Sequence, residues 1–144
     1  MSYSVDTNIL LYASDESSPE HVAARRFMET RAEDTDLFCL TWVTVLGYQR
    51  IATHPGIFSK PLSPQVAWQN VRSLLSLPRV RMVGEGQHFA EDFESLGKDI
   101  LVRGNLVPDA HLATILREHG VGLIYTMDTD FRKFPFLKVI NPLK

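Results

Sequence analysis

Short apolar runs alternate along this chain with longer stretches in which apolar residues recur at helical spacing. Strands that alternate with helices are typical of βαβ units, in which successive strands pair in parallel. The pattern therefore predicts an α/β fold with a central, mainly parallel sheet. The runs expected to form its strands are Tyr3–Val5, Leu37–Leu40, Val80–Val83, Leu123–Thr126 and Lys138–Ile140.

Turn and capping residues set the limits of the predicted helices. Pro19 suits the first turn of a helix, and Thr41 and Ser63 each stand directly before an apolar stripe with helical spacing. His119-Gly120 fits a helix end, because glycine adopts the left-handed conformation that often follows the last turn. The helices predicted in this way cover 8–13, 19–30, 42–54, 64–77, 87–101 and 108–120, with a loop at 57–62.

Length and composition fit a globular protein. The chain has 144 residues, of which 22% are charged and 44% hydrophobic. A chain of this size buries enough surface for one core, so residues 1–144 are predicted to form a single domain. The formal net charge of −2 argues against a protein that holds nucleic acid through overall basicity. A local basic rim could still form on folding.

Membrane and targeting signals are not found in the sequence. No stretch approaches the roughly 20 apolar residues of a membrane-spanning helix, and the N-terminus lacks the basic start and apolar centre of a signal peptide. We therefore expect a cytoplasmic protein with no membrane association. Cys39 is the only cysteine, which excludes an internal disulfide and a cluster of thiolate metal ligands.

Four aspartates occupy predicted strand ends or helix starts. Asp6 follows the first strand, Asp109 stands at a predicted helix start, and Asp128 and Asp130 follow the strand that ends at Thr126. Parallel strands end at one edge of a sheet, where α/β proteins bind ligands. Each aspartate could instead cap a helix or hold a turn. Their joint placement predicts that they converge in one crevice.

Several carboxylates in one crevice repel one another unless a cation lies between them. Ligands that are all oxygen atoms favour a hard divalent ion such as Mg²⁺ or Mn²⁺. Such an ion supports hydrolysis of a phosphodiester by an activated water. The sequence offers no Ser-His-Asp or Cys-His arrangement, and its five histidines have no zinc-binding spacing. His111, close to Asp109, is expected on the surface of its helix.

Three segments of the chain resemble the PIN-domain ribonucleases, and in particular the VapC toxins of bacterial toxin–antitoxin pairs. They are Val5–Tyr12, Asn105–Ala113 and Tyr125–Phe131. The segment Arg50–Phe58 is similar to one VapC subgroup. The aspartate segments follow one another in the family's order and separation, so the resemblance spans nearly the whole chain.

The resemblance implies a three-layer α/β/α sandwich and an endoribonuclease that depends on Mg²⁺ or Mn²⁺. It also implies the toxin of a type II toxin–antitoxin pair, with an RNA substrate, a cognate VapB-type antitoxin as inhibitor, and a homodimer. The positions that match the family's site are Asp6, Asp109 and Asp128 as catalytic metal ligands, Asp130 as a further metal ligand, and Asn8 and Thr126 as supporting groups.

One position departs from the family's pattern. Many members carry a glutamate on the helix after the second strand, and this chain has Gly47 there. Three hypotheses follow: the aspartates suffice, another acid such as Glu91, Glu94 or Asp99 takes the place of the glutamate, or the activity is weak. We favour the first, because Mg²⁺ commonly keeps several waters. The alternative function is a PIN-fold binding module with weak or no catalysis.

Two other protein classes also place an aspartate after the first strand. Phosphatases of the HAD type carry a second acid two positions later, where this chain has Asn8. Receiver-like domains carry an adjacent acidic pair, whereas Asp6 is flanked by Val5 and Thr7. The missing acids argue against an aspartyl-phosphate mechanism in either form.

Aromatic and apolar residues suggest further contacts. Trp42, Tyr48 and Phe131 are candidates for stacking on RNA bases, a common mode of single-stranded recognition. A second set could form a subunit interface: Phe58, Trp68, Leu74 and Leu75. The helical spacing of both sets also fits ordinary core packing.

Overall fold

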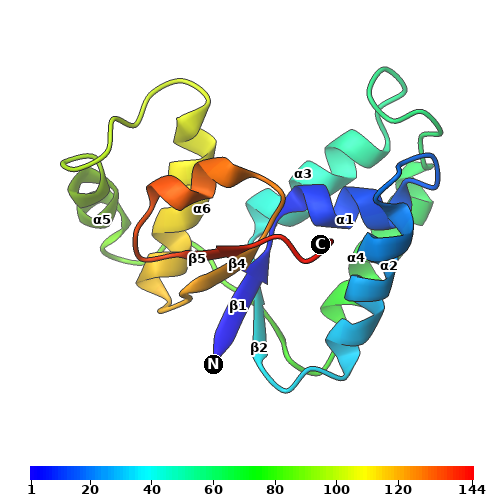
Figure 1. The fold of residues 1–144 in the computed structure, drawn as a ribbon, viewed down its shortest axis with the longest axis horizontal. Coiled ribbons are helices and arrows are strands. Elements are labelled where there is room, and N and C mark those ends of the chain that lie inside the picture. The colour runs from blue at the N-terminus through cyan, green and yellow to red at the C-terminus, as the bar shows by residue number, and fades with distance from the viewer.

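The computed structural model describes residues 1–144 and shows a five-stranded sheet with helices on both faces (Figure 1). The strands lie in the order β3-β2-β1-β4-β5, and every neighbouring pair is parallel. The predicted α/β fold with a parallel sheet is therefore confirmed. The strands are β1 (Ser2–Val5), β2 (Leu37–Leu40), β3 (Val80–Met82), β4 (Leu123–Tyr125) and β5 (Lys138–Ile140).

The helices form two layers because the chain adds strands first toward one edge of the sheet and then toward the other. From β1 the chain steps outward to β3, and the helices on this path cover one face; between β3 and β4 it returns across the sheet, and the helices of this return cover the other face. The first layer holds α1 (Thr7–Ser14), α2 (His21–Glu29), α3 (Trp42–Ala52) and α4 (Pro64–Leu75). The second holds α5 (Phe89–Leu96), α6 (Leu106–Glu118) and the 3₁₀ helix η2 (Thr129–Lys133); a further 3₁₀ turn, η1 (Thr30–Ala32), follows α2.

Alternating side chains of the strands divide the core between the two faces. Phe38 and Leu40 of β2 pack into the cluster under α1, α3 and α4, whereas Cys39 between them packs into the cluster under α5 and α6. Cys39 is thus a small buried core residue.

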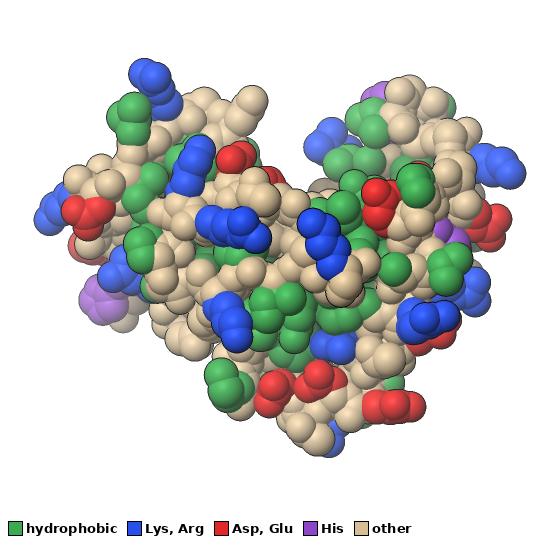
Figure 2. Space-filling view, viewed as in Figure 1, with side chains coloured by type: hydrophobic (Ala, Val, Ile, Leu, Met, Phe, Trp, Pro, Cys, Tyr) green, Lys and Arg blue, Asp and Glu red, His purple; other side chains and the backbone are tan.

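The order in which the chain adds strands reverses between β1 and β4, the point at which open α/β sheets form a crevice at their carboxyl ends. Figure 1 shows α6 and η2 on one side of these strand ends and α1 and α3 on the other. The space-filling view shows the molecule hollowed between the two groups of helices (Figure 2). The fold thus opens a notch directly over the ends of its central strands.

Local capping agrees with the sequence at three helix ends. The side-chain hydroxyls of Thr41 and Ser63 each accept a backbone N–H from the first turn of the next helix, at 3.1 Å. Gly120 has φ of +69°, and the following amide bonds back to the carbonyl of Leu116 at 2.9 Å. This left-handed residue closes α6 as expected.

Three helices differ from the prediction by two residues or more at the following ends. Helix α2 begins at His21, two residues after Pro19, because 18–21 forms a separate turn closed by the Ser18 carbonyl. Helix α5 covers only Phe89–Leu96 and ends at Gly97. Helix α6 begins at Leu106, so Pro108 lies inside its first turn, where a missing N–H costs no hydrogen bond.

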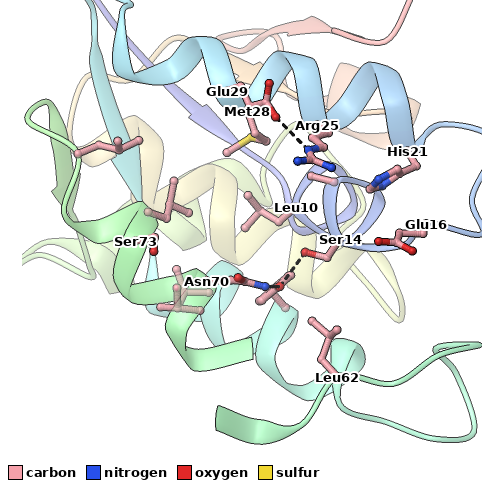
Figure 3. A pocket seen from close by; sticks show the side chains of 16 residues that line it. Leu10, Ser14, Glu16, His21, Arg25, Met28, Glu29, Leu62, Asn70 and Ser73 are labelled. Carbon is pink, nitrogen blue, oxygen red and sulfur yellow. Dashed lines mark hydrogen bonds and ion pairs between the residues drawn. The ribbon is translucent and has the colours of Figure 1, made fainter. Parts of the chain in front are cut away.

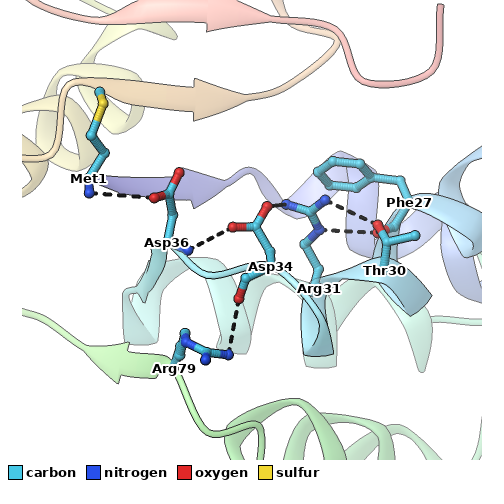
Figure 4. A network of polar contacts seen from close by, with 7 residues as sticks. All are labelled: Met1, Phe27, Thr30, Arg31, Asp34, Asp36 and Arg79. Carbon is cyan, nitrogen blue, oxygen red and sulfur yellow. Dashed lines mark hydrogen bonds and ion pairs between the residues drawn. The ribbon is translucent and has the colours of Figure 1, made fainter.

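A polar network fixes the opposite, amino edge of the sheet (Figure 4). Arg31 donates to the carbonyl of Phe27, pairs with Asp34 at 3.4 Å, and lies over the Phe27 ring at 4.0 Å. Asp34 also accepts the amide of Asp36, which pairs with the amino group of Met1. The network holds the start of β2 against the start of β1.

No helix of the structure combines the length and the apolar character that crossing a bilayer requires.

Candidate metal centre

Three carboxylates converge at the notch. Asp109 lies in the first turn of α6, Asp128 follows β4, and Asp130 is in η2. One carboxylate oxygen from each of them lies within 4.8 Å of the other two. The first turn of α6 and the segment from the end of β4 into η2 supply these groups, so the fold brings together residues that were predicted to meet.

Asp6 lies beside this group of three but is not a member of it. Its Oδ1 accepts the backbone N–H of Thr7 at 2.8 Å, and its Oδ2 accepts the hydroxyl of Thr126 at 2.7 Å. Burial raises the pKa of the Asp6 carboxyl, the two hydrogen bonds oppose that rise, and the nearby charge of Asp128 adds to it. Asp6 therefore forms the floor of the site, with both oxygens already engaged by the protein.

Thr126 connects the residues of the site. Its side chain is 1% exposed. The hydroxyl donates to Asp6 and accepts both the amide N–H of Asp128 at 2.9 Å and the side-chain amide of Asn8 at 3.3 Å. The Oδ1 atom of Asn8 is buried and has no hydrogen-bond partner in the protein. This oxygen is available to a water or another ligand in the site.

The charge of the cluster is visible in the pKa of Asp109, which is raised to about 6 from 3.8. Burial is the first cause, followed by the negative charges of Asp128, Asp6 and Asp130. Lys133 opposes the rise and lies 3.6 Å from Asp130, but both side chains are more than half exposed, so solvent screens this pair. The cluster carries more negative charge than the protein neutralises, and a divalent cation with oxygen ligands fits it.

Capping explains only two of the predicted site aspartates. Asp6 caps α1, and Asp128 accepts the amide of Asp130 at 2.9 Å to hold the start of η2. Asp109 caps nothing, because α6 begins three residues earlier and its N-cap is Asn105. The expectation that Asp109 opens its helix is wrong. Capping therefore does not account for the carboxylate with the largest pKa rise in the site.

Gly47 faces the first turn of α1. A Cβ at this position would lie 3.4 Å from Oγ1 of Thr7, and that hydroxyl donates to the carbonyl of Thr44 at 3.0 Å. This contact between α1 and α3, next to Asp6, has no signal in the sequence pattern. The side of α3 near the site thus has no carboxylate. Of the acids considered as replacements, none belongs to the convergent group: Glu91, Glu94 and Asp99.

The structure separates the aromatic candidates for RNA contact. Tyr48 and Phe131 are 3% and 1% exposed and pack in the core, so the core-packing alternative holds for both and neither can stack on bases. Trp42 is 47% exposed. Phe58, considered for a subunit interface, is also buried, whereas Trp68 is partly exposed.

His111 lies on the surface of α6, as expected. Its Nε2 is 3.1 Å from Glu85, and its ring packs edge-on against Phe89. Glu85 lies between β3 and α5, and Phe89 is the first residue of α5. His111 therefore holds the start of α5 and the segment before it, and is not turned toward the carboxylates.

Comparisons of the sequence give one consistent result. The PIN domain family matches residues 3–137. Ribonuclease VapC48 of Mycobacterium tuberculosis is 39% identical over 142 residues, which cover 99% of this chain and 98% of that protein. Ribonuclease VapC43 of the same species is 33% identical over 139 residues, with 96% and 94% of the two chains covered.

Solved structures with the same fold come from toxin–antitoxin systems. VapBC2 from Rickettsia felis, bound to a DNA fragment from its promoter, aligns with a TM-score of 0.68 at 17% identity, over 96% of this chain and 97% of that one. VapC20 of Mycobacterium tuberculosis, a toxin that cleaves the sarcin–ricin loop, aligns with a TM-score of 0.63 at 19% identity, over 90% and 92%. These likenesses show the fold.

Proposed function

The chain belongs to the VapC family of PIN-domain ribonucleases, and on that basis we propose that it is a Mg²⁺- or Mn²⁺-dependent endoribonuclease acting as the toxin of a type II toxin–antitoxin pair in the cytoplasm. The observation that carries the proposal is the group formed by Asp109, Asp128 and Asp130 beside the partly buried Asp6. The proposal treats residues 1–144 as one domain.

The residues have distinct parts in this proposal. Asp109, Asp128 and Asp130 would hold the cation, with Asp6 at the floor of the site as a further ligand or as the acceptor that fixes Thr126. When bound, a divalent ion supplies an acidified water and stabilises charge on the leaving oxygen of a phosphodiester. The hydroxyl of Thr126 bonds to both the carboxylate of Asp6 and the backbone of Asp128 and so fixes their relative positions. Asn8 offers its free Oδ1 to a water in the site.

Cleavage of RNA tests this proposal directly. End-labelled cellular RNA is incubated with the purified chain in Mn²⁺ or Mg²⁺ and, in parallel, in EDTA. We expect discrete fragments only with metal, and none from Asp128→Asn. Asp99→Asn serves as the matched control, because Asp99 is exposed and lies outside the acidic group. Equal cleavage in EDTA, or by Asp128→Asn, contradicts the proposal.

An antitoxin polypeptide is the proposed inhibitor, since related folds occur in complexes such as VapBC2 from Rickettsia felis. A cavity of about 500 Å³ between α1, α2, α3 and α4 suits an apolar segment of such a partner (Figure 3). One part of the cavity wall is polar. There the hydroxyl of Tyr48 forms hydrogen bonds with the hydroxyl of Ser14 at 2.8 Å and with the side-chain amide of Asn70 at 3.0 Å. The ionisable residues that line the cavity are Glu16, His21, Arg25 and Glu29.

Ala13 lines this cavity from α1 and offers a test of the partner. Ala13→Glu should abolish binding of the cognate VapB-type antitoxin, because a charge would be buried against the apolar wall. RNA cleavage should persist. Ala90→Glu places the same change at an exposed position of α5 in the other layer, and this variant should bind the antitoxin normally.

A homodimer is also proposed, and light scattering of the purified chain measures its mass.

A further inference from the structure

One face of α3 is apolar and exposed. Trp42, Val43 and Leu46 are 47%, 44% and 51% exposed, while Val45 and Tyr48 on the other face are buried. Residues four apart in a helix lie on one side, so Trp42, Leu46 and Arg50 form a stripe along α3. Arg50 is exposed and has no ion pair in the structure. The stripe therefore combines an aromatic start with a free positive end.

The register of the sheet places this stripe at the notch. Strands β1 and β2 pair in parallel as Ser2 with Leu37 and Tyr3 with Phe38, an offset of 35 residues. Continuing that offset sets Asp6 beside Thr41, about 4.8 Å away in the next strand. Trp42 follows Thr41 directly and is the first residue of α3. The stripe thus begins next to Asp6, the residue that adjoins the acidic group.

Hydrogen bonding fixes that arrangement from the other side. Thr7, the residue after Asp6, donates from its hydroxyl to the carbonyl of Thr44 in the first turn of α3. Gly47 leaves the flank of α3 toward Thr7 without a side chain. The start of α3 is therefore held close to Asp6, and the helix then leads away from the carboxylates.

We propose that Trp42 is a stacking platform for an unpaired base of the RNA substrate next to the scissile phosphate, and that Arg50 contacts the backbone of the same strand. Unpaired bases are commonly bound by stacking on aromatic side chains, and the backbone by positive groups. Arg50 lies about 12 Å along the helix from Trp42. This inference rests on the ribonuclease function proposed above and defines its substrate as single-stranded at the cleavage site.

A second copy of the chain is the rival occupant of this stripe, and the structure favours RNA. Each partner in a stable dimer buries about 800 Å², whereas only three apolar side chains are exposed here. The position of the stripe beside the carboxylates matches a substrate that must reach them.

Fluorescence tests the stacking without catalysis. The chain has two tryptophans, so Trp68→Phe leaves Trp42 as the only indole. In EDTA, which prevents cleavage, a single-stranded RNA oligonucleotide should quench the emission of this variant strongly. In Trp42→Phe, where Trp68 remains, the same RNA should leave emission nearly unchanged. Equal quenching of the two variants overturns the inference, as does a blue shift of Trp42 emission that grows with protein concentration and without RNA.

Kinetics give an independent measurement. Trp42→Ala should raise KM for a single-stranded RNA roughly tenfold with little change in kcat, and Trp42→Tyr should restore most of the loss. Arg50→Gln should reduce the slope of log affinity against log salt by about one. If wild type cleaves RNA and Trp42→Ala has an unchanged KM, the inference fails while the proposed function stands. If wild type cleaves no RNA, the proposed function itself fails.

Discussion

The hydroxyl of Thr126 donates a 2.7 Å hydrogen bond to Asp6, a residue 120 positions earlier in the chain. The same oxygen accepts the amide of Asp128. One buried hydroxyl thus joins the ends of the two central strands at the point where the acidic site begins.

Thr126→Val should therefore weaken both the fold and the site. Valine keeps the shape but leaves the Asp128 amide and an Asp6 oxygen without a partner, at a cost of roughly 2 kcal/mol in unfolding free energy. Urea denaturation measures this cost, and calorimetry with Mn²⁺ should show weaker binding. Thr126→Ser keeps the hydroxyl and should resemble wild type in metal affinity. A Val variant with wild-type stability and Mn²⁺ affinity contradicts the bonding role.

The raised pKa of Asp109 predicts how stability depends on pH in the absence of metal. Its folded pKa of about 6 exceeds the reference value of 3.8, so the folded state binds the proton more tightly than the unfolded state. The resulting stabilisation is present below pH 3.8 and is lost as pH rises through about 6. Burial shifts the pKa of Asp6 in the same direction. In EDTA, Tm should therefore fall as pH rises from 3.8 to about 6 and level off above that pH.

Asp109→Asn provides the comparison for that measurement. An amide carries no charge at any of these pH values, so the variant should lose much of the decline in Tm and melt higher than wild type at pH 7 in EDTA. A wild-type Tm that rises over the same range would contradict the electrostatic account of the site.

Removal of metal should lower the Tm, whereas acid in the absence of metal should raise it. Mn²⁺ should raise the Tm of wild type at pH 7 because it binds the folded carboxylates and relieves their repulsion. The Mn²⁺ affinity should fall on acidification through about pH 6, where Asp109 takes up its proton. Calorimetry at pH 5.5 and pH 7.5 measures the difference. Asp128→Asn should bind Mn²⁺ more weakly at both values, whereas the exposed Asp99→Asn should bind it like wild type.

Gly47 offers a test by addition. Its Cβ position is in ordinary contact with Thr7, so a side chain fits without displacing the backbone. Gly47→Glu should place a carboxylate beside Asp6 and tighten Mn²⁺ binding, on the order of tenfold, since one more charged ligand joins the site. Gly47→Ala controls for the change in helix propensity, which favours alanine by about 1 kcal/mol. Unchanged affinity in the Glu variant would show that this side of α3 does not reach the cation.

Arg31 lies at the opposite edge of the sheet and should affect stability alone. Its side chain is 9% exposed and is held by Phe27 and Asp34. Arg31→Lys loses the planar contact with Phe27 and at least one hydrogen bond, for a cost of roughly 1–3 kcal/mol. Its Mn²⁺ affinity at temperatures below the melt should equal that of wild type. A weakened metal site in this variant contradicts the separation of the two edges.

Local patterns predicted the elements of the fold well. Apolar runs located all five strands, and Thr41 and Ser63 marked helix starts because capping depends on residues only a few positions apart. The start of α6 was misplaced for a local reason too. Pro108 is acceptable anywhere in a first turn, so it did not fix the first residue.

The arrangement within the site depends on distant packing and could be predicted only in part. The sequence indicated that the four aspartates converge, but not that Asp6 would lie outside the closest group with both oxygens bonded. Tyr48 and Trp42 have similar helical surroundings in the sequence, yet one is buried and the other exposed. Which face of α3 meets the sheet decides between them, and no local pattern carries that information.

The central position of β1 also determines when, during synthesis of the chain, the acidic site becomes complete. Strand β1 is made before its neighbour β4. The pairing of β4 with β1 and the hydrogen bond from Thr126 to Asp6 can form only after 120 further residues have been added. At 5–20 residues per second, that wait lasts roughly 6–24 seconds. We expect a growing or truncated chain that lacks Asp128 and Asp130 to be harmless to RNA, so an antitoxin needs to meet the toxin only at the end of its synthesis.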